Sequence, residues 1–200
     1  MKLMTPVPEK NDPGARDHFN KWSKTYENTW EQKIFFQRVH RAVIALAITV
    51  APDVGTILDV GCGTGKLLRA AGVRWPNAAR IGVDAVEGMI EVAQDLTPDV
   101  TFHVGVAENL PLPDSSVDLV FSTTSFHHWT DQTAGLGEVA RVLRPGGHFF
   151  LADIALPMGN SFKGKGKIRT LFTNAGLQVF AQKRVAFHVT LVTGGIKQGI

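Results

Sequence analysis

The sequence predicts an α/β fold in which a mostly parallel sheet is covered by helices on both faces. Short apolar segments alternate with stretches of helical periodicity, glycines follow the first of these segments, and the first two segments end in or near an acidic residue. Short strands that alternate with helices build parallel sheets that are buried on both faces. Because right-handed crossovers join such strands, their carboxyl ends should meet along one rim.

Helices are expected before the first strand. Polar and aromatic residues follow a helical spacing over His18–Asn28, and a longer apolar periodicity covers Trp30–Ala51, where Pro52 ends it. Residues 13–51 are therefore predicted to be N-terminal helices. Residues 1–12 combine proline with mixed charge and lack an apolar run, so we expect a disordered lead-in rather than a signal peptide.

A repeating strand and helix unit begins at Thr56. The apolar segments predict strands near residues 56–60, 79–83, 100–105, 117–122 and 147–153. The periodicity between them predicts helices near residues 65–74, 87–95 and 132–143.

The last part of the chain completes this core. A helix is expected over Ile168–Ala175 with Gly176 as its C-cap, followed by a hairpin of two strands, Gln178–Phe187 and Val189–Thr193. With residues 55–200 as one core, the 200-residue chain should form a single domain. A domain of this size buries roughly 70% of the surface of its unfolded chain.

The composition is that of an ordinary globular protein and excludes some classes of site. Ala42–Ala51 is the longest apolar stretch and is too short to span a membrane. Cys62 is the only cysteine, which excludes an internal disulfide and makes a metal cluster unexpected. Its position between glycines favours a small packing residue over a reactive thiol, and a reducing, cytoplasmic setting fits these features.

Charge is unevenly distributed. Residues 154–200 carry seven Lys or Arg and no acid, whereas residues 1–153 carry a net charge of −4. Such asymmetry indicates either an anionic partner or a solvated basic face, and the second interpretation is favoured.

The most informative segment is the turn after the first strand, Asp59-Val60-Gly61-Cys62-Gly63-Thr64-Gly65. Glycine has no Cβ, so this turn lets a ligand approach the backbone, and the helix behind it offers unpaired N–H groups. A phosphate-binding P-loop does not fit, because its first glycine would fall at Val60 and its hydroxyl at Leu67. A dinucleotide turn fails by one residue, because Lys66 stands where glycine or alanine is required.

One further motif precedes the first strand, and four others follow the glycine turn in the order that a repeating strand and helix unit requires. They are Phe19–Glu27, Ile81–Asp84, Val104–Pro113, Val117–Ser122 and Val142–Leu151. Together with the glycine turn they resemble the motifs of class I S-adenosylmethionine-dependent methyltransferases. The resemblance is to the subgroup that contains the ubiquinone and menaquinone C-methyltransferases and many enzymes that methylate small molecules, and it covers residues 19–153.

The resemblance implies a Rossmann-like, doubly wound, mostly parallel seven-stranded sheet with an antiparallel last strand, and S-adenosylmethionine as the cofactor. Tyr26 would close over the methionine end of the cofactor, unless it only packs beside neighbouring tryptophans. Asp84 would accept the ribose hydroxyls and Glu108 the adenine amino group. The residues expected to bind the cofactor are Tyr26, Asp59, Gly61, Cys62, Gly63, Gly65, Asp84, Ala85, Met89, Ala107, Glu108, Asn109 and Thr123.

Several of these residues have an alternative, structural role. Asp59 either supports the methionine amino group or only holds the turn, and Glu108 is either an adenine contact or a helix cap. Met89 and Leu110 either sandwich the adenine or belong to the core. Asp118 begins a strand away from the rim, so a structural role is favoured there.

A candidate base lies in Ser125–Asp131, directly after the fourth strand. This segment resembles the histidine-rich turn that borders the acceptor pocket in the subgroup. An imidazole of ordinary pKa accepts a proton at neutral pH. His127 and His128 are the catalytic candidates, with His127 favoured; alternatively, one caps the following helix and the other packs.

The favoured function is transfer of a methyl group from S-adenosylmethionine to a small-molecule acceptor by in-line displacement. The acceptor would be a quinone precursor or another aromatic, and the Gly- and Lys-rich connection Ala155–Lys167 would hold an anionic group on it. Alternatives are an RNA or protein methyltransferase, a non-catalytic S-adenosylmethionine-binding protein and an NAD-dependent oxidoreductase. Nucleic acid is disfavoured because Ser122-Thr123-Thr124 stands where methyltransferases of planar nitrogens carry Asn/Asp-Pro-Pro-Tyr/Phe.

Overall fold

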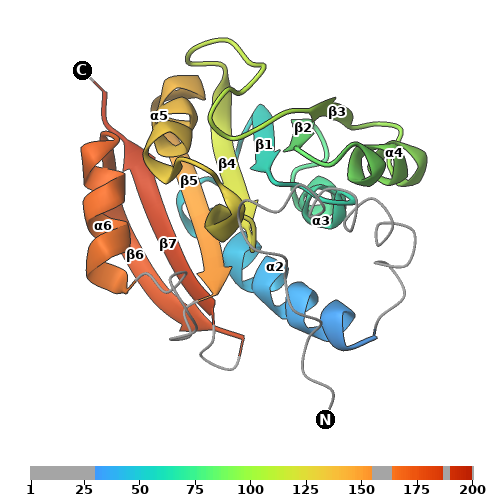
Figure 1. Ribbon diagram of the computed structural model, residues 1–200, viewed down its shortest axis with the longest axis horizontal. Coiled ribbons are helices and arrows are strands. Elements are labelled where there is room, and N and C mark those ends of the chain that lie inside the picture. Colours follow the sequence, from blue (N-terminus) through green and yellow to red (C-terminus); the bar gives the residue numbers. More distant parts are fainter. Residues whose placement is uncertain (1–29, 155–163, 187–189, 200) are drawn as a thin grey trace.

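The computed structural model describes residues 30–154, 164–186 and 190–199 (Figure 1). The predicted helix over His18–Asn28, the predicted lead-in over residues 1–12 and Tyr26 lie outside these residues.

The described residues form a seven-stranded sheet in the order β3-β2-β1-β4-β5-β7-β6, which Figure 1 shows from right to left. The strands are β1 Thr56–Val60, β2 Ala79–Asp84, β3 Thr101–Val104, β4 Val117–Thr123, β5 Leu143–Ile154, β6 Leu177–Val185 and β7 Thr190–Lys197. Strands β1 to β5 pair in parallel, and β7 is antiparallel to both of its neighbours, β5 and β6. The predicted mostly parallel sheet with an antiparallel last strand is therefore confirmed.

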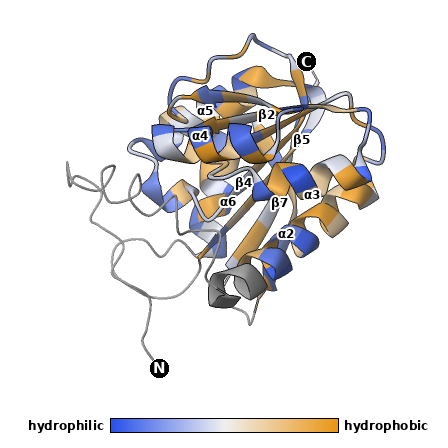
Figure 2. Ribbon diagram, turned by 90° about the vertical axis from the view of Figure 1, so that its right-hand side faces the viewer, coloured by the Kyte–Doolittle hydropathy of each residue, from blue (hydrophilic) through white to orange (hydrophobic). Residues whose placement is uncertain are grey.

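Helices cover both faces of this sheet. They are α2 Trp30–Val50, α3 Lys66–Arg74, α4 Glu87–Leu96, α5 Gln132–Val142 and α6 Lys165–Asn174, with a short 3-10 turn, η1, at Phe126–His128. Helices α2, α3 and α4 pack against one face, and α5 and α6 pack against the other. Helix α2 carries hydrophobic and hydrophilic residues around its turns, as expected for a helix with one buried side (Figure 2).

Side-chain alternation along the strands builds two hydrophobic layers. In β4, Val120 lies in the layer shared with α5 and α6, and Phe121 lies in the layer shared with α2 and α3. Both are fully buried. Successive strand residues point to opposite faces, so a strand covered on both sides is apolar over most of its length, which is the pattern that predicted it.

Three element boundaries differ from the prediction by three or four residues, and one of them is the end of β7, at Lys197 rather than Thr193. Strand β5 begins at Leu143 rather than residue 147, because the Pro-Gly-Gly segment bulges within the strand, with Gly146 at φ 81°, instead of ending it. Helix α6 begins at Lys165 rather than Ile168, because Ile168 and Phe172, buried one turn apart, fix the helix from its first turns. Gly176 ends α6 at φ 78°, as predicted for a C-cap glycine.

Candidate functional site

The glycine turn joins β1 to α3 at the carboxyl rim of the sheet. Gly61, Gly63 and Gly65 have positive φ angles of 75°, 52° and 76°, which residues with a Cβ rarely adopt. The N–H groups of Gly61 and Cys62 both donate to the carbonyl oxygen of Val83, at 2.7 and 3.1 Å. The turn is therefore bound to the end of the neighbouring strand β2.

The glycines of this turn serve different purposes. A Cβ added at Gly61 would lie 1.8 Å from Ser125 Oγ, so the turn after β4 requires a glycine here. A Cβ added at Gly63 would meet no atom of the described residues within 4 Å. Gly63 therefore presents its backbone to open space, which is the arrangement needed for a ligand that contacts the main chain.

Asp84 ends β2 and connects the glycine turn to the start of α4. Its Oδ2 accepts a hydrogen bond from the Gly63 N–H at 2.8 Å, and its Oδ1 accepts one from the Val86 N–H at 2.9 Å. Burial raises the pKa of this carboxyl, and the N–H groups of Val86, Gly63 and Ala85 offset part of that rise. The carboxylate is held rigidly beside the turn and keeps acceptor capacity for hydroxyl groups.

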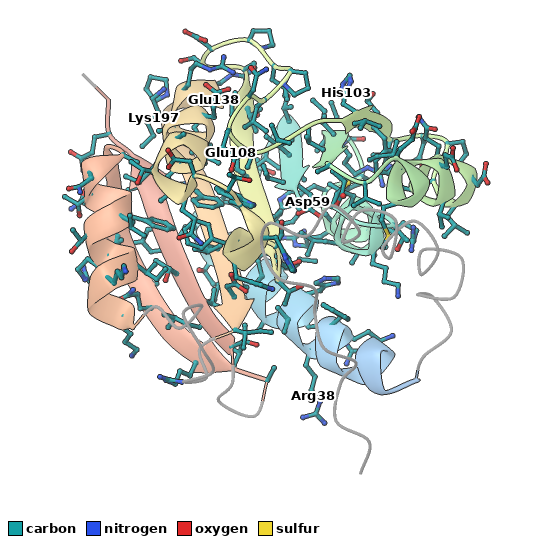
Figure 3. The ribbon with its side chains drawn as sticks, viewed as in Figure 1. Arg38, Asp59, His103, Glu108, Glu138 and Lys197 are labelled. Carbon is teal, nitrogen blue, oxygen red and sulfur yellow. The ribbon has the colours of Figure 1, made fainter. Side chains whose placement is uncertain are left out.

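Asp59 is the second acid at this rim and lies near α3 (Figure 3). Its side chain is buried, and its Oδ1 has no hydrogen-bond partner among the described residues. Burial, and secondarily the charge of Asp84, raise the pKa of Asp59 well above its ordinary value. A buried carboxyl oxygen with no donor suits a ligand that brings a donor or a positive charge, such as an ammonium group.

The segment after β3 carries three more predicted residues. Ala107 is buried and Asn109 is exposed. Glu108, near α5 in Figure 3, accepts a hydrogen bond from the Asp131 N–H through Oε1 at 2.9 Å. Asp131 is the N-cap of α5, so Glu108 does support a helix start, the alternative role expected for it. Met89 and Leu110, predicted near the adenine, are both buried.

A histidine of α2 that was not predicted as a site residue lies beside the end of β4. His40 of α2 places its Nε2 3.4 Å from Thr123 Oγ1, at the last residue of β4. Burial lowers the pKa of His40 to about 4, with help from the charges of Lys66 and Arg69. The imidazole is therefore neutral near pH 7. In the sequence, His40 directly follows the apolar Val39 within a helical pattern. This position is equally typical of an ordinary helix side chain, so it did not indicate a site residue.

The two predicted histidines have different surroundings. The His127 N–H donates to Asp153 Oδ2 at 2.8 Å, and His127 Nδ1 lies 2.7 Å from Asp153 Oδ1. His128 is exposed, and its ring centroid lies 4.0 Å from that of His127. In the sequence analysis, Asp153 was predicted only as the last residue of the fifth strand. An acid at the end of a strand on this rim was the sequence signal that could have identified it as a site residue.

Asp118 lies at the opposite end of the sheet. Its Oδ2 accepts hydrogen bonds from the N–H groups of Gly55 and Thr56, at 2.9 and 2.8 Å, and its Oδ1 accepts one from Arg144 at 2.5 Å. These contacts hold the amino end of β1, which is the structural role favoured for Asp118 from the sequence.

No helix in the described part of the chain is long and apolar enough to cross a membrane. The same residues contain no cluster of three or more His, Cys, Asp or Glu side chains that could hold a metal ion.

Comparison with known proteins agrees with this geometry. Residues 58–151 match a family model described as a methyltransferase domain. Over 162 residues the chain is 34% identical to a demethylmenaquinone methyltransferase of Symbiobacterium thermophilum, covering 76% of this chain and 63% of that protein. It is 29% identical to a malonyl-[acyl-carrier protein] O-methyltransferase of Dechloromonas aromatica, covering 84% of this chain and 67% of that protein. The chain thus spans less than two thirds of the demethylmenaquinone methyltransferase.

A solved structure supports the fold. The chain matches the 1,6-didemethyltoxoflavin-N1-methyltransferase of Burkholderia thailandensis, solved with 1,6-didemethyltoxoflavin and S-adenosylhomocysteine, with a TM-score of 0.75. The match covers 98% of this chain and 94% of that protein at 18% identity.

Proposed function

We propose that this chain, which belongs to the class I S-adenosylmethionine-dependent methyltransferases, transfers a methyl group from S-adenosylmethionine to a small-molecule acceptor by in-line displacement. The observation that carries the proposal is the joint arrangement of Gly63 and Asp84. An open backbone position and a fixed carboxylate lie in direct hydrogen-bond contact, at the rim where two parallel strands end.

The residues at this rim fit the cofactor. Asp84 would accept the ribose hydroxyls, since its two carboxylate oxygens keep acceptor capacity beyond their backbone donors. Asp59 would receive the methionine amino group on its unpartnered Oδ1. The remaining cofactor contacts are assigned to Tyr26, Gly61, Cys62, Gly65, Ala85, Met89, Ala107, Asn109 and Thr123.

Glu108 is assigned to the adenine amino group. Its bond to the Asp131 N–H engages Oε1 and leaves further acceptor capacity on the carboxylate. This assignment predicts that Glu108→Gln weakens cofactor binding without unfolding the start of α5, because the amide oxygen can still accept from Asp131.

When bound, S-adenosylmethionine supplies a methyl group on a positively charged sulfur. The chain must then align the acceptor with that methyl group and keep water away, and alignment alone lowers barriers by up to about 7–11 kcal/mol in the best cases. His127 is the residue proposed to take a proton from the acceptor, with His128 the second candidate. Either role predicts a large loss of methyl transfer on substitution by alanine.

The acceptor is proposed to be a small aromatic or quinone-like molecule, and the basic segment at the start of α6 would attract an anionic group on it. Lys165 and Lys167 are exposed there, and Lys163 lies just outside the described residues. Replacing these three lysines by glutamine should raise the KM for the acceptor. An unchanged KM would remove the segment from the acceptor site.

The proposal is tested by incubating the purified chain with methyl-labelled S-adenosylmethionine and an extract of the source cell, and then identifying the labelled product. A labelled small molecule supports the proposal, and labelled RNA or protein supports the alternative class of methyltransferase. Tight cofactor binding with no labelled product from any fraction would indicate a non-catalytic binding protein.

The single cysteine supports a cytoplasmic, reducing setting for the reaction.

A further inference from the structure

We infer that Asp153 is a positioning residue that holds His127 as the general base, and that the acceptor is therefore a molecule with a proton to lose at the methylated atom. The inference rests on the proposed function and narrows its substrate class. Acidic hydroxyl groups and activated C–H groups belong to this class, whereas thioethers and pyridine-type nitrogens do not.

The carboxylate of Asp153 fixes both the backbone and the ring of His127. Its Oδ2 accepts from the His127 N–H at 2.8 Å, and its Oδ1 lies 2.7 Å from Nδ1. Oδ1 also accepts from the Ile154 N–H at 2.8 Å. One carboxylate therefore binds the residue at two points, which restricts the imidazole to one orientation.

This contact also selects the protonation pattern of the ring. An ionised carboxylate only accepts hydrogen bonds, so Nδ1 must carry the hydrogen. In the neutral ring Nε2 then has the lone pair and is the nitrogen that can take a proton. A carboxylate on Nδ1 further stabilises the cation that forms when Nε2 is protonated. Both side chains are mostly buried, at 18% and 12% exposure, so solvent screens the interaction only partly.

The pair lies on the same rim as the glycine turn. Asp153 follows Ala152, which pairs with Thr123 at the end of β4, and the Thr124 N–H donates to the Ala152 carbonyl at 2.7 Å. Ser125, two residues before His127, lies against Gly61. The turn that carries the base is thus in direct contact with the proposed cofactor turn.

A purely structural role for Asp153 would require only the bond to the His127 backbone, which stabilises the 3-10 turn. The second bond, to Nδ1, adds nothing to the turn itself, yet it places a carboxylate from the neighbouring strand β5 on the ring. This is the feature that assigns Asp153 to the chemistry of His127.

In the proposed step, methyl transfer to the acceptor is accompanied by loss of its proton. The acceptor atom forms a bond to the methyl carbon, the bond from that carbon to sulfur breaks with its electron pair left on sulfur, and the proton of the acceptor atom moves to Nε2 of His127. The protonated ring returns its proton to solvent after the product leaves. A neutral acceptor with no such proton would become a cation on methylation and an ionised acceptor would become neutral, and neither would need a base.

A first test is independent of the acceptor and of the cofactor. Heteronuclear NMR of the full chain should show hydrogen on Nδ1 of His127, and Asp153→Ala should shift the ring toward the Nε2–H tautomer. His103→Gln, on β3 and outside the site, is the matched control and should leave the His127 signals unchanged. A wild-type ring with hydrogen on Nε2, or His127 signals that do not change in Asp153→Ala, would overturn the inference.

The second test measures the initial rate of label transfer into the same cell extract. His127→Ala should reduce the rate by about 10²–10⁴-fold, which is the usual contribution of a general base. Asp153→Asn, which keeps the shape of the side chain, should reduce the rate at least tenfold, and Asp153→Glu should restore part of it. Binding of S-adenosylhomocysteine and the thermal unfolding midpoint should stay close to those of the His103→Gln control.

The outcomes separate this inference from the proposed function. Label transfer that survives in His127→Ala and Asp153→Asn would overturn the inference and leave the methyltransferase assignment standing. A methylated product that is a sulfonium or quaternary nitrogen compound would also overturn it. No label transfer and no binding of S-adenosylhomocysteine by the wild-type chain would instead remove the proposed function.

Discussion

The side chain of Ser125 lies directly against the Cα of Gly61, so closely that a Cβ on residue 61 would come within 1.8 Å of the hydroxyl oxygen. The glycine turn after β1 and the histidine-bearing turn after β4 therefore form one packed unit. A change at Gly61 or Ser125, where the two turns meet, should affect both cofactor binding and the position of His127.

Substitution of Gly61 and Gly63 by alanine should separate packing from ligand contact. Gly61→Ala must push Ser125 away, so we expect it to lower the free energy of unfolding by about 1–3 kcal/mol and to weaken binding of S-adenosylhomocysteine. Gly63→Ala adds a methyl group in open space at a positive φ, so it should cost only about 1–2 kcal/mol of stability. If Gly63 faces the ligand, this smaller cost should accompany a loss of affinity of at least tenfold.

Urea unfolding and calorimetric titration of both variants provide the comparison. Wild-type affinity in Gly63→Ala would show that the open side of this glycine does not face the cofactor.

Asp84→Asn should weaken cofactor binding strongly. Hydrogen bonds to a charged group contribute about 1.5–3 kcal/mol, so the dissociation constant of S-adenosylhomocysteine should rise by about 10- to 150-fold. Asp95→Asn, an exposed acid on α4, is the matched control and should bind normally. Equal affinities of the two variants, measured by calorimetry, would contradict the ribose assignment.

Asp59 should make the ligand-free protein less stable at neutral pH than at lower pH. The folded-state pKa of this carboxyl is raised, so the folded chain binds more protons than the unfolded chain between the ordinary and the raised value, and stability falls as pH rises through that window. Asp59→Asn should therefore increase stability at neutral pH and weaken cofactor binding. Urea unfolding across this window provides the check; a variant less stable than wild type at neutral pH would refute it.

His40 should make stability fall in acid. Its pKa is lowered from 6.5 to about 4, so the unfolded chain binds more protons between these values, and stability decreases as pH falls through that range. The loss should be about 1–3 kcal/mol, reduced by the partial exposure of the ring. His40→Gln should lose less stability than wild type over the same pH range, and equal pH dependences of the two proteins would contradict the assignment.

Arg141 should be important for the loop that carries Asn109. It binds Glu138 through two hydrogen bonds, at 2.6 and 2.7 Å, and donates to the carbonyls of Leu110 and Leu112. The hydrogen bond from Arg141 lowers the pKa of the Glu138 carboxyl. Arg141→Met would remove these donors, although Glu138 Oε2 keeps the Leu110 N–H and the Leu110 carbonyl keeps the Leu112 N–H. The substitution should cost about 1–3 kcal/mol of unfolding free energy. A cost below that of an exposed substitution such as Arg74→Met would show that the network contributes no net stability.

The sequence predicted the strands well because burial on both faces requires a short apolar run, such as Leu119–Phe121 within β4. The sequence predicted the boundary of a strand less well where glycine and proline lie within the strand. The Pro-Gly-Gly segment looks like a chain break, but pairing of His148 with Leu119 keeps it within β5. Long-range pairing of this kind leaves no local signal.

The site was predictable only where its residues are neighbours in sequence. The glycine turn and Asp84 belong to local motifs, whereas Asp153 reaches His127 across 26 positions and His40 reaches Thr123 across 83. Parallel crossovers bring strand ends together, but they do not specify which side chains meet. The same reason explains why Ser125 was read only as part of the histidine turn, although it packs on Gly61.

Calorimetric titration of the purified chain with S-adenosylmethionine, S-adenosylhomocysteine and NAD tests the central claim most directly. We expect saturable binding of the first two compounds at one site, lost or strongly weakened in Asp84→Asn, and no binding of NAD. Absence of binding of both adenosyl compounds to a folded chain, or equal binding by Asp84→Asn, would contradict the assignment of this rim.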